Sequence, residues 1–166
     1  MATEASRQER FAERVERHRG IIFKVANTYG HHPDDRDELA QEIAVQLWRA
    51  FPGYDHARPF STWMYRIALN VGISHVRRAA SRHEHAVPLD VELHDIPDDN
   101  GADHERDQQV RALHRFMARL HTLDRALLLL YLEEHTYREI AEILGITETN
   151  VATKVSRLKQ RIRSEI

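Results

Sequence analysis

The sequence predicts an all-α protein made of two small helical domains joined by a flexible acidic linker. Apolar residues recur at helical spacing through most of the 166 residues, and few β-branched alternations appear. This periodicity stops over residues 83–107, where prolines and acidic residues are frequent. A chain of this length suits one domain or two small ones, so we expect domains at 1–82 and 108–166 with 83–107 as the linker.

Three helices are expected in the first domain. A helix over 6–29 has an apolar stripe that includes Phe11 and Val25, and Gly30 ends it before a His-His-Pro break. A second helix begins at Pro33, whose ring presets the first turn, and the acidic residues that follow suit the positive end of the helix dipole. Its buried face is expected to consist of Leu39, Ile43, Leu47, Trp48 and Phe51.

Pro52 and Gly53 stop the second helix, and a loop leads to Ser61, which is the expected N-cap of the third helix. The far end of that helix is basic. Trp48 and Trp63 lie at helical spacing among aliphatic residues, which favours core packing over base stacking.

In the second domain, one helix is expected near Val110 to Leu120, and a buried helix over 123–132 is apolar on nearly all sides. Thr136 and Glu139 form a capping box that opens a short helix ending at Leu144. Gly145 permits a tight turn, and Thr147 caps the final helix. This spacing predicts a helix-turn-helix, although short capped hairpins also occur in purely structural bundles.

Composition limits the possible functions. The formal net charge is −2, but residues 83–107 hold nine acidic side chains and one basic, whereas residues 147–166 hold five basic and two acidic. Cysteine is absent, so disulfides and thiolate zinc sites are excluded, and we expect a cytoplasmic protein without membrane insertion. No metal site, cofactor or enzyme motif is predicted, and the histidines of the linker are expected to be solvated.

Three blocks of sequence together resemble the extracytoplasmic-function (ECF) sigma factors. Residues 34–42 (DDRDELAQE) with 47–51 (LWRAF) resemble region 2.2 of that family, and residues 60–70 (FSTWMYRIALN) resemble region 2.3 entering region 2.4. Residues 127–162 resemble region 4. Ser74 and His75 depart from the family, which often has Asp and an aromatic residue there.

The resemblance implies a non-enzymatic subunit that binds core RNA polymerase through the β′ clamp helices and the β flap. Glu38, Gln41 and Glu42 match the clamp-binding positions and lie largely away from the apolar stripe. For the acids at positions 34, 35 and 37, a role as a favourable helix start is an equal alternative. The family's usual regulator is a sequestering anti-sigma protein.

The resemblance also implies that promoter DNA is bound at two elements. At the melted −10 element, the loop 53–60 and Asn70 match positions that hold a flipped base, although Asn70 also suits a local helix cap. The residues expected to bind the −10 element are Tyr54, His56, Arg58, Arg66, Asn70, Arg77 and Arg78.

The −35 element is expected to be read as duplex by the last helix. Its small outward residues allow close approach to the major groove, and its basic residues can neutralise phosphates. The residues expected to bind the −35 element are Thr149, Asn150, Thr153, Lys154, Ser156, Arg157, Lys159 and Arg161. Two alternatives remain: a stand-alone helix-turn-helix regulator, and a sigma-like adaptor without promoter function.

Overall fold

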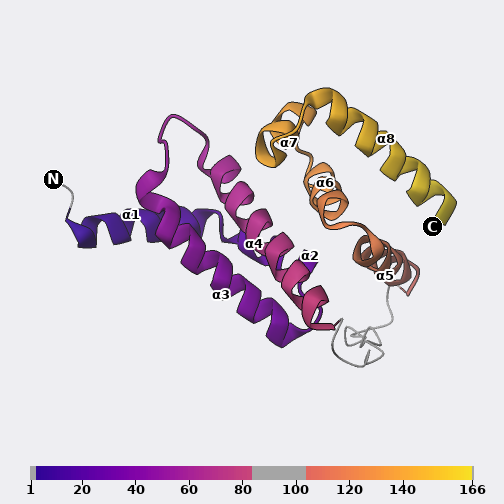
Figure 1. Cartoon of the computed structure of the whole chain (residues 1–166), viewed down its shortest axis with the longest axis horizontal. Coiled ribbons are helices and arrows are strands. Elements are labelled where there is room, and N and C mark those ends of the chain that lie inside the picture. Colours follow the sequence, from indigo (N-terminus) through magenta and orange to yellow (C-terminus); the bar gives the residue numbers. More distant parts are fainter. Residues whose placement is uncertain (1–2, 84–103, 166) are drawn as a thin grey trace.

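The computed structural model describes residues 3–83 and 104–165, and every regular element in these two ranges is helical (Figure 1). The predicted all-α class is confirmed. No helix in the described ranges is both long and apolar enough to cross a membrane. Residue 83 and residues 104–107, predicted as linker, belong to helices α4 and α5; the remainder of the predicted linker lies outside the described residues.

The N-terminal half consists of α1 (Glu4–Arg17), α2 (Arg19–Tyr29), α3 (Pro33–Ala50), the 3-10 turn η1 (Phe51–Gly53) and α4 (Phe60–His83). Helices α2, α3 and α4 pack on one another around a core of fully buried side chains. The fully buried residues include Val25, Leu39, Ile43, Leu47 and Met64. The predicted inner face is therefore confirmed for Leu39, Ile43 and Leu47; Phe51 is also buried but belongs to η1, and Trp48 is half-buried.

Two predicted helix boundaries were wrong. The single helix over 6–29 is divided at His18, whose backbone leaves the helical region with φ −118° and ψ 16°. The ring of His18 lies 5.5 Å from the ring of Phe60, a tertiary interaction that accompanies the break. Ser61 is not an N-cap, because α4 already begins at Phe60 and Ser61 lies in its first turn.

The C-terminal half consists of α5 (His104–Arg119), α6 (Thr122–Leu132), α7 (Tyr137–Leu144) and α8 (Glu148–Glu165). The predicted caps are confirmed: the hydroxyl oxygen of Thr136 accepts from the N–H of Glu139 at 3.1 Å. Gly145 ends α7 with a φ of +69°, a conformation that favours glycine. The helix-turn-helix is thus defined by local hydrogen bonds and one left-handed residue.

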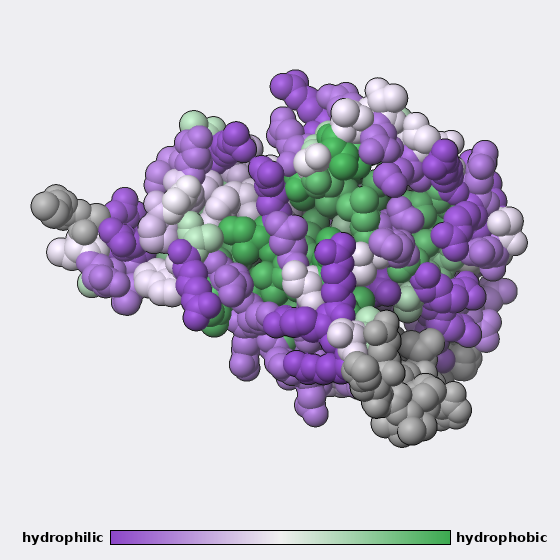
Figure 2. Space-filling view, viewed as in Figure 1, coloured by the Kyte–Doolittle hydropathy of each residue, from purple (hydrophilic) through white to green (hydrophobic). Residues whose placement is uncertain are grey.

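The two halves pack against each other, with α4 beside α6 and α7, and α2 beside α5. The hydroxyl of Tyr29 donates to the carbonyl oxygen of Thr122, and the Arg125 guanidinium lies 5.7 Å from the centre of the Tyr29 ring. Lys24 and Glu133 form an ion pair across the same boundary. On the side of the molecule drawn in Figures 1 and 2, apolar side chains gather in the middle, with hydrophilic residues around them (Figure 2).

Candidate polymerase-docking and DNA-reading surfaces

The predicted docking residues lie along α3. Glu38 and Gln41 are exposed, whereas Glu42 is half-buried because it turns toward α4. There its carboxylate forms an ion pair with Arg78, and Nδ1 of His75 lies 3.7 Å from Glu42 Oε2. Glu42, predicted to bind polymerase, therefore contacts Arg78, predicted to bind DNA.

His75 bridges α3 and α4, a role that the sequence analysis did not predict. Its Nε2 lies 2.7 Å from a carboxylate oxygen of Asp35, and the backbone N–H of His31 donates to the other oxygen at 3.0 Å. Partial burial raises the pKa of Asp35, but the hydrogen bonds from His31 and His75 outweigh it and leave the pKa below its ordinary value. The sequence contained one sign of this role: a histidine stands at position 75, where the family often has an aromatic residue.

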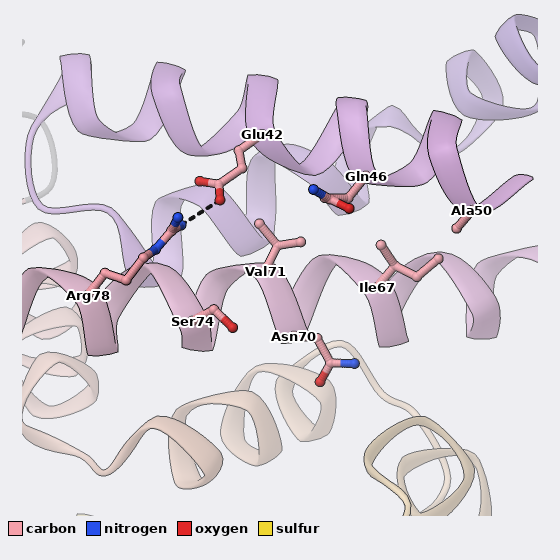
Figure 3. Close-up of a pocket in the computed structure, with 8 residues that line it drawn as sticks. All are labelled: Glu42, Gln46, Ala50, Ile67, Asn70, Val71, Ser74 and Arg78. Atoms are coloured by element: carbon pink, nitrogen blue, oxygen red, sulfur yellow. Dashed lines mark hydrogen bonds and ion pairs between the residues drawn. The ribbon is translucent and has the colours of Figure 1, made fainter.

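A cleft of about 440 Å³ runs along the surface where α3 and α4 meet. Figure 3 shows Glu42, Gln46 and Val71 facing one another across it, whereas the amide of Asn70 is directed away from α3 at the edge of the cleft. The cleft is lined by Glu42, Gln46, Ala50, Ile67, Asn70, Val71, Ser74 and Arg78. Asn70 is exposed and has no hydrogen-bond partner among the described residues, so its donor and acceptor are both available to a base.

The loop that precedes α4 is held in shape by its own side chains. Tyr54 is only 7% exposed, its hydroxyl donates to the carbonyl oxygen of Arg58, and its ring packs 5.1 Å from the ring of Trp63. Asp55 accepts from the N–H of Ala57 at 3.0 Å. His56 and Arg58 are exposed. Tyr54 is therefore positioned to support the loop, while His56 and Arg58 face solvent.

The predicted −10 residues do not share one cavity. Asn70 and Arg78 line the cleft between α3 and α4, whereas His56 lines a separate hollow beside α1. Arg66 and Arg77 are exposed on α4 and form no ion pair within the described ranges. The −10 surface thus extends along α4 and onto the loop that precedes it.

The predicted −35 residues lie on α8, whose inner side is buried through Val151, Val155 and Leu158. Thr147 caps this helix by accepting from the N–H of Asn150 at 3.1 Å. The outward residues at its N-terminal end and middle are exposed, except Lys154, which is half-buried. The exposed members are Thr149, Asn150, Thr153, Ser156 and Arg157.

The basic residues of α8 differ in their partners. The ammonium of Lys159 lies 4.9 Å from the centre of the Tyr131 ring, and a hydrogen bond with Tyr131 raises the pKa of Lys159. The Arg161 guanidinium lies 5.4 Å from the Phe116 ring and 3.7 Å from a carboxylate oxygen of Glu165. Lys154, Arg157 and Arg163 have no such partner within residues 3–83 and 104–165, so Lys154 and Arg157 are freer than the other two predicted basic contacts, Lys159 and Arg161.

Comparison with known proteins covers both halves. Residues 14–82 match Sigma-70 region 2, and residues 110–162 match Sigma-70 region 4. The ECF sigma factor SigW of Bacillus subtilis is 24% identical over 175 residues, covering 96% of this chain and 90% of SigW. SigE of Mycolicibacterium smegmatis is 26% identical over 155 residues, covering 91% of this chain. CnrH of Cupriavidus metallidurans is 35% identical over 63 residues, 38% of this chain.

The chain spans 59% of the length of SigE, and the match to CnrH spans 33% of that protein. Among solved structures, the sigma factor RpoE of Bartonella quintana, in complex with the anti-sigma factor NepR, matches with a TM-score of 0.76 at 16% identity. That match covers 94% of this chain and 96% of RpoE.

CnrH in complex with the cytosolic domain of CnrY matches with a TM-score of 0.65 at 24% identity, over 95% of this chain and 87% of CnrH. These likenesses show the same fold. The two region matches occur in the order that the sequence predicted, one in each half of the structure. The chain therefore belongs to the sigma-70 family of RNA polymerase sigma factors, within its extracytoplasmic-function group.

Proposed function

We propose that this protein is an alternative sigma factor that binds core RNA polymerase and directs initiation at a particular set of promoters. The observation that carries the proposal is the presence of both sigma regions in one helical chain, with an exposed polar strip on α3 and an exposed basic face on α8. A stand-alone helix-turn-helix regulator would not need the region 2 half, and the comparisons give that alternative no support. Catalysis would belong to the polymerase.

In this proposal, Glu38, Gln41 and Glu42 meet the β′ clamp helices, and the helix-turn-helix half contacts the β flap. The two glutamates and the glutamine lie within about one turn of α3. Glu38 and Gln41 are exposed away from its buried face, and Glu42 lies at the flank nearest α4. Charged hydrogen bonds of this kind give specificity and rate of association as well as affinity.

Promoter recognition would be divided between the two halves. Asn70 and the loop around His56 and Arg58 would bind the melted −10 strand, with Arg66, Arg77 and Arg78 on phosphates. Helix α8 would enter the major groove of the −35 element, with Thr153, Ser156 and Arg157 near base edges.

Regulation by a sequestering anti-sigma protein is part of the proposal. NepR and the cytosolic domain of CnrY are present in the complexes of the two structural relatives. The apolar side chains exposed at the middle of the molecule in Figure 2 offer an area of the kind that protein partners cover.

Reconstituted transcription tests the proposal. The purified chain is added to core polymerase on a library of promoters with randomised −35 and −10 elements, and transcript 5′ ends are mapped by sequencing. Enrichment of one pair of elements is expected. A stand-alone regulator or an adaptor would leave the transcripts the same as those of core polymerase alone.

A further inference from the structure

Helix α1 begins ten residues before the part of the chain that matches Sigma-70 region 2, which starts at residue 14. It is nevertheless held firmly against the first half. The ring of Phe11 lies 5.1 Å from the ring of Trp48 in α3 and 5.1 Å from the ring of Phe51 in η1. Thr3 caps the helix by accepting from the N–H of Ser6 at 3.2 Å. Residues 4–13 thus have a defined place beside the loop that precedes α4.

A hollow of about 130 Å³ lies where α1 meets this loop. Arg7 and Arg10 line it from α1, Phe51 and Pro52 from η1, and His56 from the loop. The His56 ring is positioned by its edge-to-face packing on the Tyr54 ring at 4.9 Å. Two guanidinium groups and an imidazole therefore line one small hollow.

Arg7 and Arg10 are exposed and form no ion pair with another described residue. Nearby arginines differ: Arg17 pairs with Glu13 at 2.9 Å, and Arg19 pairs with Glu16 at 3.2 Å. Residues three apart on a helix are neighbours, so the charges of Arg7 and Arg10 lie close enough to repel each other.

The basic side of α1 continues toward the loop. Arg14, four residues beyond Arg10, places its guanidinium 5.5 Å from the centre of the Tyr54 ring and 5.7 Å from that of Phe60. Helix geometry puts Arg7, Arg10 and Arg14 on one side of α1, whereas Glu9 and Glu16 fall on the far side. Glu13, at the flank of the arginine side, is paired with Arg17. Positive charge is thus concentrated on the side that faces the loop.

We infer that Arg7, Arg10 and His56 form a binding site for a phosphodiester of single-stranded DNA, next to the nucleotide held by the loop 53–60. Guanidinium groups bind phosphate oxygens with paired N–H donors, and an exposed histidine adds a ring N–H donor. The inference rests on the proposed function, because the loop gives the DNA strand its approach to this hollow. It assigns a role to Arg7 and Arg10, which lie outside the matched sigma regions.

The test uses the full chain assembled with core polymerase and a promoter selected in the transcription experiment. Holoenzymes carrying wild-type protein, R7A/R10A or R17A are titrated onto two forked probes, with affinity measured at several salt concentrations. One probe ends at the −10 element, and the other continues as a single strand beyond it. Arg17 is the matched control because it lies on the same helix but is already paired with Glu13.

The double variant is expected to bind the longer probe about 10- to 100-fold more weakly than wild type, because it loses hydrogen bonds between charged groups. Its salt slope should fall by about 0.7 for each phosphate that the protein no longer neutralises. On the shorter probe, R7A/R10A and wild type should bind alike, and R17A should match wild type on both.

If the wild-type protein transcribes, and R7A/R10A binds the longer probe as tightly as wild type does, the inference is overturned while the proposed function stays intact. An equal loss of affinity on both probes, or weaker binding to core polymerase alone, would also overturn it and indicate a protein interface. Far-UV circular dichroism checks that α1 remains folded in each variant. Failure of the wild-type protein to transcribe would instead reject the proposed function.

Discussion

The hydroxyl of Tyr29 lies 2.7 Å from the carbonyl oxygen of Thr122 and donates a hydrogen bond to it, joining α2 of the first half to α6 of the second. The same ring packs closely against α4: a Cβ atom added at Gly72 would lie 2.7 Å from Cδ2 of Tyr29. Burial raises the pKa of Tyr29 above its ordinary value, more than the nearby Arg125 lowers it. The hydroxyl therefore stays protonated as a donor at neutral pH.

Tyr29→Phe removes this donor and leaves the Thr122 carbonyl without that partner. We expect the free energy of unfolding to fall by about 1–2 kcal/mol, as measured by urea denaturation. Tyr137→Phe is the control, because the Tyr137 hydroxyl makes no hydrogen bond with another described residue. A Tyr29→Phe protein as stable as wild type would show that this hydrogen bond does not hold the halves together.

Replacement of Gln41 and Glu42 by alanine tests the docking surface. The fold should persist, since neither side chain is in the core, and affinity for core polymerase should fall by about 1–3 kcal/mol. Gln8 and Glu9, an exposed pair of the same residue types on α1, provide the matched control. Unchanged affinity in a titration with core polymerase would contradict the assignment of α3.

Arg157 and Lys154 are expected to act differently on the −35 element. Arg157→Ala should change which −35 substitutions are tolerated, whereas Lys154→Ala should weaken binding evenly and reduce the salt slope by about 1. Arg138→Ala, on α7 and 3.7 Å from Glu142, serves as the control. If Arg157→Ala alters neither affinity nor preference across a substitution series, its base-proximal role is refuted.

Asn70→Ala separates melting from base recognition when it is assayed on an intact promoter and on the same promoter with a pre-opened −10 bubble. We expect weaker transcription from the intact promoter and a loss of about 1–3 kcal/mol of discrimination between −10 bases. Asn27→Ala, an exposed asparagine on α2, is the control. Wild-type behaviour of Asn70→Ala on both templates would place base recognition elsewhere.

Acid stability should depend on Asp35. Its pKa in the folded protein is below the ordinary value of 3.8, so its stabilising effect is complete above that value and is lost as pH falls through the lower folded pKa. Asp35→Asn should therefore lower stability at neutral pH and reduce the further loss of stability below about pH 4. Urea denaturation at several pH values measures both effects, and parallel curves for variant and wild type would contradict the prediction.

Local chemistry made much of the fold predictable. Pro33, Thr136 and Gly145 act within one turn of their own position, so the sequence around them is enough to place a helix start, a cap and a left-handed residue. The apolar stripe of α3 was predictable for a similar reason, because a single helix with one buried face repeats its pattern along the chain.

Tertiary interactions decided the rest. The break at His18 goes with its packing on Phe60, and the burial of Tyr54 depends on aromatic neighbours from α4 and η1, none of which the local pattern reports. Asn70 likewise lines a different hollow from His56, because it lies well along α4 from the loop while α1 closes over the loop itself. Periodicity identifies which residues face inward, but it does not identify the neighbours that they meet.

The pairing of Glu42 with Arg78 makes the two proposed binding events thermodynamically linked. A polymerase surface that draws Glu42 away leaves the Arg78 cation uncompensated, which increases its attraction for a phosphate, and DNA that takes Arg78 frees Glu42 in return. Linkage requires the two effects to be equal in size. Because the Arg78 side chain is 54% exposed, the pair is worth about 1 kcal/mol or less, which limits this cooperativity to a few-fold change in affinity.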